Sequence, residues 1–189
     1  LIGELDHCFH KFDEITLKYG MEKIKTIGDA YMAAGGIPDA NRTHPLDAVL
    51  SALEMQHVMM HMKREKERQG LPFWQIRLGI HTGPLVAGVI GTEKFSYDVW
   101  GDTVNTASRM ESSGMPEMVN ISRETYNAVA DFFDCEYRGK LVAKNKGEID
   151  MFFVRRLKAE YAADAAGIIP NEKLLGIRRA IETQIRSAA

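Results

Sequence analysis

The stretch EKIKTIGDAYM, residues 22–32, decides the fold of the chain around it. Residues 23–27 mix polar with apolar residues in a nearly alternating order and include β-branched side chains, which is typical of a half-buried β-strand. Gly28 and Asp29 interrupt this pattern, and a second strand-like run follows at residues 30–34. A glycine beside a short polar residue is a strong turn signal between two strands. The sequence therefore predicts a β-hairpin with Asp29 at its turn.

Helical patterns lie on either side of this hairpin. Apolar residues recur every three to four positions over residues 1–19, which predicts an amphipathic helix that ends at Gly20. Pro45 opens a second helical segment that runs to the charged stretch at residues 63–68. We interpret that charge run as a solvated helix face.

Strands dominate the remainder up to residue 156, with two further helices between them. We expect helices over residues 102–112 and from about Ser122, and strands over residues 74–81, 85–90, 95–100, 119–121, 134–141 and 149–154. Strands and helices do not alternate strictly. The order therefore favours an α+β fold over a doubly wound parallel sheet.

The C-terminal part of the chain has a different composition. From Leu157 onward alanines and charged residues dominate, with Gly167 and Pro170 between two helical patterns. We expect a single domain over residues 1–156 and a helical extension, in two pieces, over residues 157–189.

Composition and charge exclude several classes of function. The chain has 189 residues, 45% of them apolar, and 24 basic residues nearly balance 26 acidic ones. This balance leaves no broad basic face for nucleic acid. Cys8 and Cys135 have no metal-ligand spacing and are expected to be packing residues in a reducing compartment. No apolar run approaches the ~20 residues that cross a bilayer, so we expect a cytoplasmic domain whose membrane anchor, if it has one, lies outside this sequence.

A second stretch, FSYDVWGDTVNTASRM at residues 95–110, carries charged and polar groups into the third predicted helix. Asp102 or Thr103 is expected to cap that helix. Asn105 and Arg109 are four residues apart and therefore project from one helix face. An isolated pair of this kind is usually a solvent-facing edge.

These two stretches together resemble the catalytic domain of class III nucleotide cyclases, of the adenylate cyclase type, and the resemblance extends over roughly residues 1–155. It implies a ferredoxin-like or palm-type fold, in which helices pack on a mixed and largely antiparallel sheet. The family's first strand, which supplies one of two metal carboxylates, should precede Leu1. Asp6 and Asp13 lie on the predicted first helix and do not match that carboxylate.

The implied reaction is that of a phosphorus-oxygen lyase, which converts ATP to 3′,5′-cyclic AMP and pyrophosphate. The resemblance assigns Asp29 as a ligand of two divalent metal ions, Mg²⁺ or Mn²⁺. A carboxylate is a hard oxygen ligand that suits both metals. The resemblance also assigns Asn105 to orient the ribose. It assigns Arg109 to stabilise charge on the reacting phosphate, a role that suits a guanidinium. Gly-Asp alone is an ordinary hairpin turn.

Lys25 and Asp98 are the residues that the resemblance assigns to the purine. Adenine presents an acceptor at N1 and a donor amino group at C6, so a lysine donor and an aspartate acceptor match its edge. Guanine presents the opposite order, and related guanylate cyclases carry a glutamate and a smaller residue such as cysteine at these positions. The pair therefore favours ATP. Alternatively, Lys25 is an exposed strand residue and Asp98 a turn residue.

The segment VAKNKGEI, residues 142–149, resembles the family segment that gives a lysine to the terminal phosphates. Lys144 matches best, with Lys146 as the alternative if the register is shifted by two. The family usually has glycine where Asn145 stands. Two lysines beside a loop are also typical of a solvated surface.

In this family the metal carboxylates come from one protomer and the other site residues from its partner. The resemblance therefore implies a homodimer with two equivalent active sites at its interface. Without the first strand, this chain alone is expected to have little or no activity. Two alternatives stay open, a guanylate cyclase and a catalytically silent cyclase-like module that dimerises and regulates a partner.

Overall fold

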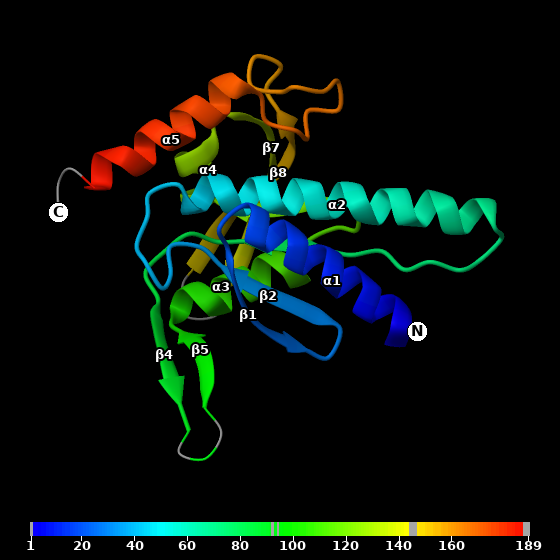
Figure 1. The fold of residues 1–189 in the computed structure, drawn as a ribbon, viewed down its shortest axis with the longest axis horizontal. Helices are drawn as coiled ribbons and strands as arrows, with labels where there is room; N and C mark the ends of the chain where they lie inside the picture. The colour runs from blue at the N-terminus through cyan, green and yellow to red at the C-terminus, as the bar shows by residue number, and fades with distance from the viewer. Residues whose placement is uncertain (1, 92, 94, 144–146, 187–189) are drawn as a thin grey trace.

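A long central helix organises the structure, which is a computed structural model that describes residues 2–91, 93, 95–143 and 147–186. The helices are α1 (Ile2–Lys18), α2 (His44–Arg68), α3 (Asp102–Ser112), α4 (Arg123–Val129) and α5 (Glu172–Arg186). The strands are β1 (Glu22–Ile27), β2 (Ala30–Ala34), β3 (Leu78–Ile80), β4 (Val86–Ile90), β5 (Ser96–Trp100), β6 (Val119–Ser122), β7 (Phe133–Ala143) and β8 (Gly147–Leu157). Figure 1 shows α2 between the hairpins on one side and α5 on the other.

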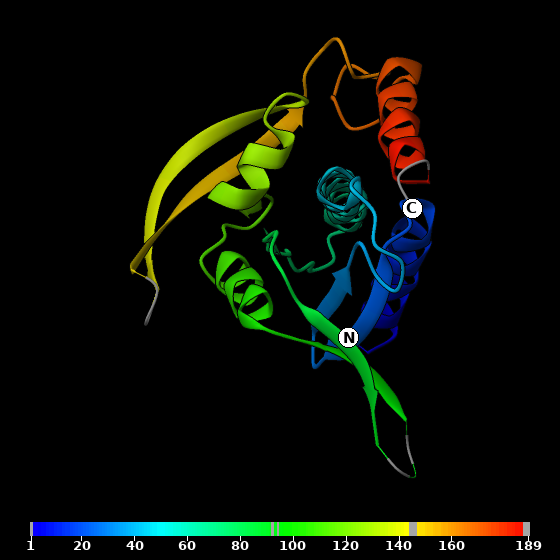
Figure 2. The same cartoon turned by 90° about the vertical axis from the view of Figure 1, so that its left-hand side faces the viewer.

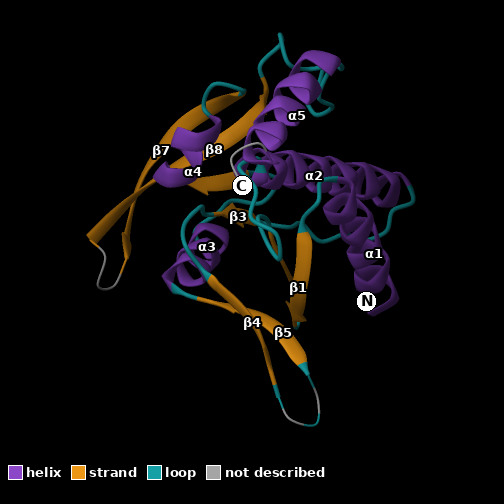
Figure 3. Cartoon of the chain, turned by 60° about the vertical axis from the view of Figure 1, so that its left-hand side comes forward, coloured by secondary structure: helices purple, strands orange, loops and turns teal. Residues whose placement is uncertain are grey.

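The strands form one four-stranded sheet and two separate hairpins (Figure 3). The four-stranded sheet has the order β3-β6-β8-β7, in which only β3 and β6 run parallel. β1 pairs with β2, and β4 pairs with β5, both antiparallel. The expected α+β fold with a mixed, largely antiparallel sheet is confirmed.

The core lies between α2 and the inner face of the four-stranded sheet, with α1 on the other side of α2 (Figure 2). Val49 and Leu50 of α2 are fully buried, as is Ile121 of β6. Phe12 and Ile15 of α1 pack into the same cluster. Burial of such side chains from several elements is the main stabilising term for a domain of this size.

Helix α3 packs directly on strand β3 because Gly79 has no side chain. A Cβ atom on Gly79 would lie 2.0 Å from the backbone nitrogen of Glu111 on α3. The buried Asn120 of β6 holds the same helix, since its side-chain amide donates a hydrogen bond to the Met110 carbonyl at 2.8 Å. The position of α3 is therefore fixed by backbone contact.

The β4–β5 hairpin extends away from the rest of the chain (Figures 1 and 2). It carries large apolar side chains with high exposure, namely Val86, Val89, Ile90 and Phe95, and the partly exposed Trp100. Exposed apolar residues that gather on one hairpin mark a contact surface more often than scattered ones do.

The C-terminal extension differs from the expected two helical pieces. Residues 158–171 form turns and an isolated bridge between Ala162 and Pro170, so only the second piece, α5, is a helix. Other contacts replace the first helix: Leu157 donates to the Gly167 carbonyl at 2.8 Å, and the centroid of the Tyr161 ring lies 5.4 Å from that of Phe132. Tertiary contacts here override the helical propensity of the alanines.

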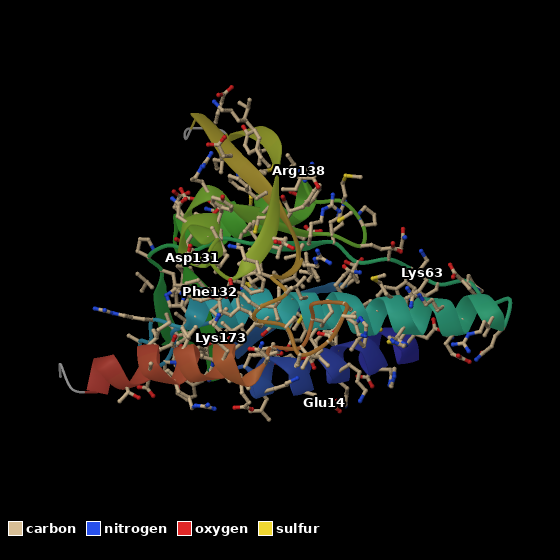
Figure 4. The ribbon with its side chains drawn as sticks, turned by 90° about the horizontal axis from the view of Figure 1, so that it is seen from above. Glu14, Lys63, Asp131, Phe132, Arg138 and Lys173 are labelled. Atoms are coloured by element: carbon tan, nitrogen blue, oxygen red, sulfur yellow. The ribbon has the colours of Figure 1, made fainter. Side chains whose placement is uncertain are left out.

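An ion pair fixes α5 against the first turn of α2. Arg178 Nε donates to Asp47 Oδ1 at 2.6 Å, and the Asp47 side chain is only 3% exposed. Thr43 donates a further hydrogen bond to the same carboxylate at 2.7 Å. Figure 4 shows α5 and α1 along the same side of α2. A buried carboxylate needs such partners.

Two local expectations are corrected. The strand expected over residues 74–81 is limited to Leu78–Ile80, because only that part pairs with β6. Gly101, rather than Asp102 or Thr103, occupies the cap position of α3, with no side-chain cap bond. The Thr103 hydroxyl instead donates to the Pro84 carbonyl at 2.5 Å.

No helix among the described residues combines the length and apolarity needed to cross a membrane.

Replacement of Gly79 tests the contact between α3 and β3. We expect Gly79→Ala to lower the free energy of unfolding by about 3 kcal/mol or more, since the added methyl group overlaps backbone that cannot move independently. Urea unfolding followed by circular dichroism measures the change. Gly176→Ala is the matched control: Gly176 lies inside α5 with open space around it, so this variant should gain up to about 1 kcal/mol. Equal stability of the two variants would contradict the close contact.

Candidate functional site

The β1–β2 hairpin places the first candidate residue at an exposed tip. Ile27 pairs with Ala30, which leaves Gly28 and Asp29 as the two-residue turn. Gly28 has φ +60°, a left-handed conformation that glycine adopts without strain. Asp29 is exposed at this tip, as predicted from the sequence.

A β-bulge in β1 changes the direction of its side chains. Lys25 pairs with Met32, but Lys23 pairs with Ala33, so Ile24 has no partner in the register. Residues opposite one another in an antiparallel ladder share a face, and faces alternate along each strand. Lys23 therefore shares a face with Tyr31, whereas Lys25 lies on the other face with Met32.

The face that carries Lys25 meets strand β5. Lys25 Nζ lies 2.5 Å from Asp98 Oδ2, and the side chains are 39% and 15% exposed. Asp98 Oδ1 also accepts the backbone N–H of Val99 at 2.8 Å. The hydrogen bond from Lys25, together with that from Val99, lowers the pKa of Asp98, which holds it as a carboxylate. The two residues predicted to read the purine are thus in contact, although 73 positions separate them.

Helix α3 follows β5 directly and carries the third and fourth candidate residues. Its inner face buries Thr103, Thr106 and Met110. Asn105 is exposed and Arg109 half-buried on an adjacent face, one turn apart. Within the described part of the chain, neither side chain has a hydrogen-bond or ion-pair partner. Both are therefore available to a bound molecule.

Lys144, and its alternative Lys146, lie outside the described residues. The described ends of this connection are Ala143 of β7 and Gly147 of β8. The predicted lysine contact to phosphate therefore remains a prediction.

A cavity beside α3 was not predicted from the sequence. It has a volume of about 280 Å³ and is lined by His81, Thr106, Arg123, Glu124 and residues 148–150. His81 Nδ1 lies 2.7 Å from Ser122 Oγ, and Arg123 lies 3.1 Å from Asp150. The parallel pairing of β3 with β6 brings His81 to Ser122. Neither residue carries a local signal of this contact.

Asp29 fits a divalent metal in its chemistry, because it is an exposed carboxylate at a turn. No group of three or more His, Cys, Asp or Glu side chains with metal-binding geometry occurs in residues 2–91, 93, 95–143 and 147–186. Asp29 could thus be one ligand of a site that needs further ligands.

The arrangement combines a charged pair that can hydrogen-bond a flat polar edge with an arginine and an asparagine on the next helix that have no partner among the described residues. Such a set can bind a purine nucleotide and stabilise charge on its phosphates. The Lys25–Asp98 pair links β1 to β5, and α3 begins two residues after β5 ends.

Comparison with known proteins gives a consistent result. The family model described as "Adenylate and Guanylate cyclase catalytic domain" matches residues 1–156. An adenylate cyclase of Mycobacterium tuberculosis is 38% identical over 154 residues, which are 82% of this chain and 34% of that protein. The chain therefore spans about a third of the length of this curated relative.

Two solved structures share the fold. The adenylyl cyclase CyaB from P. aeruginosa superposes with a TM-score of 0.78 at 27% identity, over 86% of this chain and 85% of that one. The guanylate cyclase domain of RhGC from Catenaria anguillulae, in complex with GTP, superposes with a TM-score of 0.73 at 31% identity, over 82% of each chain. With the family model matched over residues 1–156, this chain belongs to the class III nucleotide cyclase catalytic domain family.

Proposed function

We propose that this cyclase domain is an adenylate cyclase, which converts ATP to 3′,5′-cyclic AMP and pyrophosphate. The observation that carries the choice of ATP is the contact between Lys25 and Asp98. The family includes enzymes that use either purine, so the choice depends on the residues at these two positions.

The edge of adenine fits the pair. Lys25 would donate to N1, which is an acceptor, and Asp98 would accept from the amino group at C6. Guanine would set its N1 proton against the ammonium group and its carbonyl oxygen against the carboxylate. Both pairs of like partners would be left unsatisfied, which costs more than a missing contact.

The remaining residues would act on ribose and phosphate. The 3′ hydroxyl would attack the α-phosphorus of the same ATP and release its proton to solvent, a new O3′–P bond would form, and the bond to the pyrophosphate oxygen would break. Asn105 would orient the ribose, and Arg109 would offset charge that develops on the phosphate. Lys144 would contact the terminal phosphates, with Lys146 as the alternative.

Asp29 would hold a divalent metal, Mg²⁺ or Mn²⁺, with ligands from outside the described residues. When bound, two such ions offset triphosphate charge and lower the pKa of the attacking hydroxyl. No protein side chain needs to act as nucleophile in this reaction.

The active form would be a homodimer, with a second copy of the domain covering the β4–β5 hairpin. The exposed apolar residues of this hairpin support that choice, because Phe95 is 73% exposed and Val86 is 67% exposed. Burial of such side chains against a partner stabilises association. The alternative is a cyclase-like domain that dimerises without catalysis. Such a domain would bind nucleotide but form no product.

The purine choice is tested on the full-length protein, as are the other activities below, with ATP and GTP offered together. For Lys25→Glu with Asp98→Cys we expect the ratio of cyclic AMP to cyclic GMP to fall by at least about tenfold, because the hydrogen-bond order of the pair is then reversed. Chromatography of both products measures the ratio. Lys11→Glu, at a lysine of α1 that pairs with Glu14, is the control and should leave the ratio unchanged. An unchanged ratio of cyclic AMP to cyclic GMP in the double variant would refute the assignment.

The role of Arg109 is tested by its removal. We expect Arg109→Ala to lower kcat by about 10²- to 10³-fold, with a smaller effect on KM, because the charge it offsets develops in the transition state. Arg109→Lys should recover only part of the loss, since a lysine lacks the planar fork of donors. Arg156→Ala is the control, because Arg156 forms an exposed pair with Asp134 at 3.0 Å. Loss of activity equal in both alanine variants would argue against the proposed role.

The dimer is tested with two exposed apolar residues. Phe95→Asp on the β4–β5 hairpin should raise the dimer dissociation constant by at least about tenfold. Sedimentation velocity measures it, and specific activity should then depend on protein concentration. Leu17→Asp, at an 82% exposed residue of α1, should leave both unchanged. If the two variants behave alike, the hairpin is not the dimer contact.

A further inference from the structure

Asp13 joins α1 to the β1–β2 hairpin, which carries Lys25 of the purine pair. Lys23 Nζ lies 2.8 Å from the Asp13 carboxylate, and Tyr31 Oη donates to Asp13 Oδ1 at 2.7 Å. Burial opposes the charged form of Asp13, but the hydrogen bonds from Lys23 and Tyr31 outweigh it and lower the pKa of this carboxyl group. One carboxylate therefore holds both strands of the hairpin.

Aromatic packing supports the same contact. The Tyr31 ring lies 5.5 Å from that of Phe9 and 5.6 Å from that of Phe12, both on α1. Lys23 Nζ lies 5.2 Å from the centre of the Tyr31 ring. The hairpin is thus held on one face by α1 and on the other face by Asp98 of β5.

The bulge at Ile24 gives this contact a consequence for Lys25. The turn at Gly28 and Asp29 fixes the register of residues 25–27. Without the bulge, Lys23 would move to the face of Lys25, two residues away, where a second ammonium group could reach Asp98. With the bulge, Lys23 lies on the α1 face and pairs with Asp13.

We infer that Asp13 is a positioning residue for purine recognition: it holds Lys23 on the α1 face and so reserves Asp98 for Lys25. This inference deepens the proposed adenylate cyclase activity and rests on it. Asp13 itself touches no substrate. The ion pair to Lys23 and the hydrogen bond from Tyr31 stabilise this position of the hairpin, and both lie in a half-exposed position.

Single and double substitutions at this pair test the inference. We expect Asp13→Ala to raise KM for ATP about tenfold and to lower the preference for ATP over GTP by a similar factor, with less than about a threefold change in kcat. Adding Lys23→Met should restore most of the preference, because no second lysine then competes for Asp98. Asp13→Glu should retain the preference for ATP over GTP. Glu14→Ala is the matched control, at an exposed neighbour on α1 (Figure 4).

If Asp13→Ala acts through loss of packing alone, the double variant should show no higher preference for ATP over GTP than Asp13→Ala does. That result, or equal effects of Asp13→Ala and Glu14→Ala, would overturn the inference.

Hydrogen exchange of the protein without nucleotide provides a reading that does not depend on activity. In Asp13→Ala the amides of residues 22–34 should exchange at least about tenfold faster, while those of β6 and β8 should not change. Unchanged exchange in the hairpin would overturn the inference, even if the wild-type protein forms cyclic AMP. If the wild-type protein forms no cyclic nucleotide, the proposed function fails, and exchange still shows whether Asp13 holds the hairpin.

Discussion

The contact of α3 with strand β3 fixes where the candidate site can form. The backbone of α3 approaches so closely that Gly79 cannot carry a side chain. Asn105 and Arg109 lie on this helix, and Asp98 lies on the strand that leads into it. Because α3 packs on backbone, small side-chain adjustments elsewhere cannot shift it, and Asn105 and Arg109 are held as one unit.

The hairpin of β1 and β2 is held in a different way. It belongs to no larger sheet among the described residues, so its position depends on side chains at its two faces. α1 contacts one face through Asp13, Lys23 and Tyr31, and β5 contacts the other through the pair of Lys25 and Asp98. A hairpin held by side-chain contacts can adjust more easily than α3, which packs on backbone. The side of the candidate site that we propose reads the purine is thus the more adaptable one, which agrees with a family that includes enzymes for both purines.

The C-terminal extension adds contacts beyond the part of the chain that matches the family. Residues 1–156 match the family model, whereas Arg178 of α5 reaches Asp47 in the first turn of α2. We propose that residues 157–189 are an extension added to the catalytic domain rather than a second domain. Asp47 is nearly fully buried, so its charge needs this partner from the extension.

Much of the fold could be predicted from the sequence because local patterns determine it, and the candidate residues follow from the resemblance of short stretches to the cyclase family. The alternation around Gly28 and Asp29 determined the hairpin, and the spacing of residues 102–112 determined α3 with Asn105 and Arg109 on one face. The sequence could not show the bulge at Ile24: regular alternation would put Lys23 and Lys25 on the same face, and only pairing with β2 separates them. The tertiary structure also decided the contact of Asp13 with the hairpin, the meeting of His81 with Ser122, and the non-helical course of residues 158–171. These features depend on residues far apart in the chain, and local periodicity does not indicate which distant residues will be in contact.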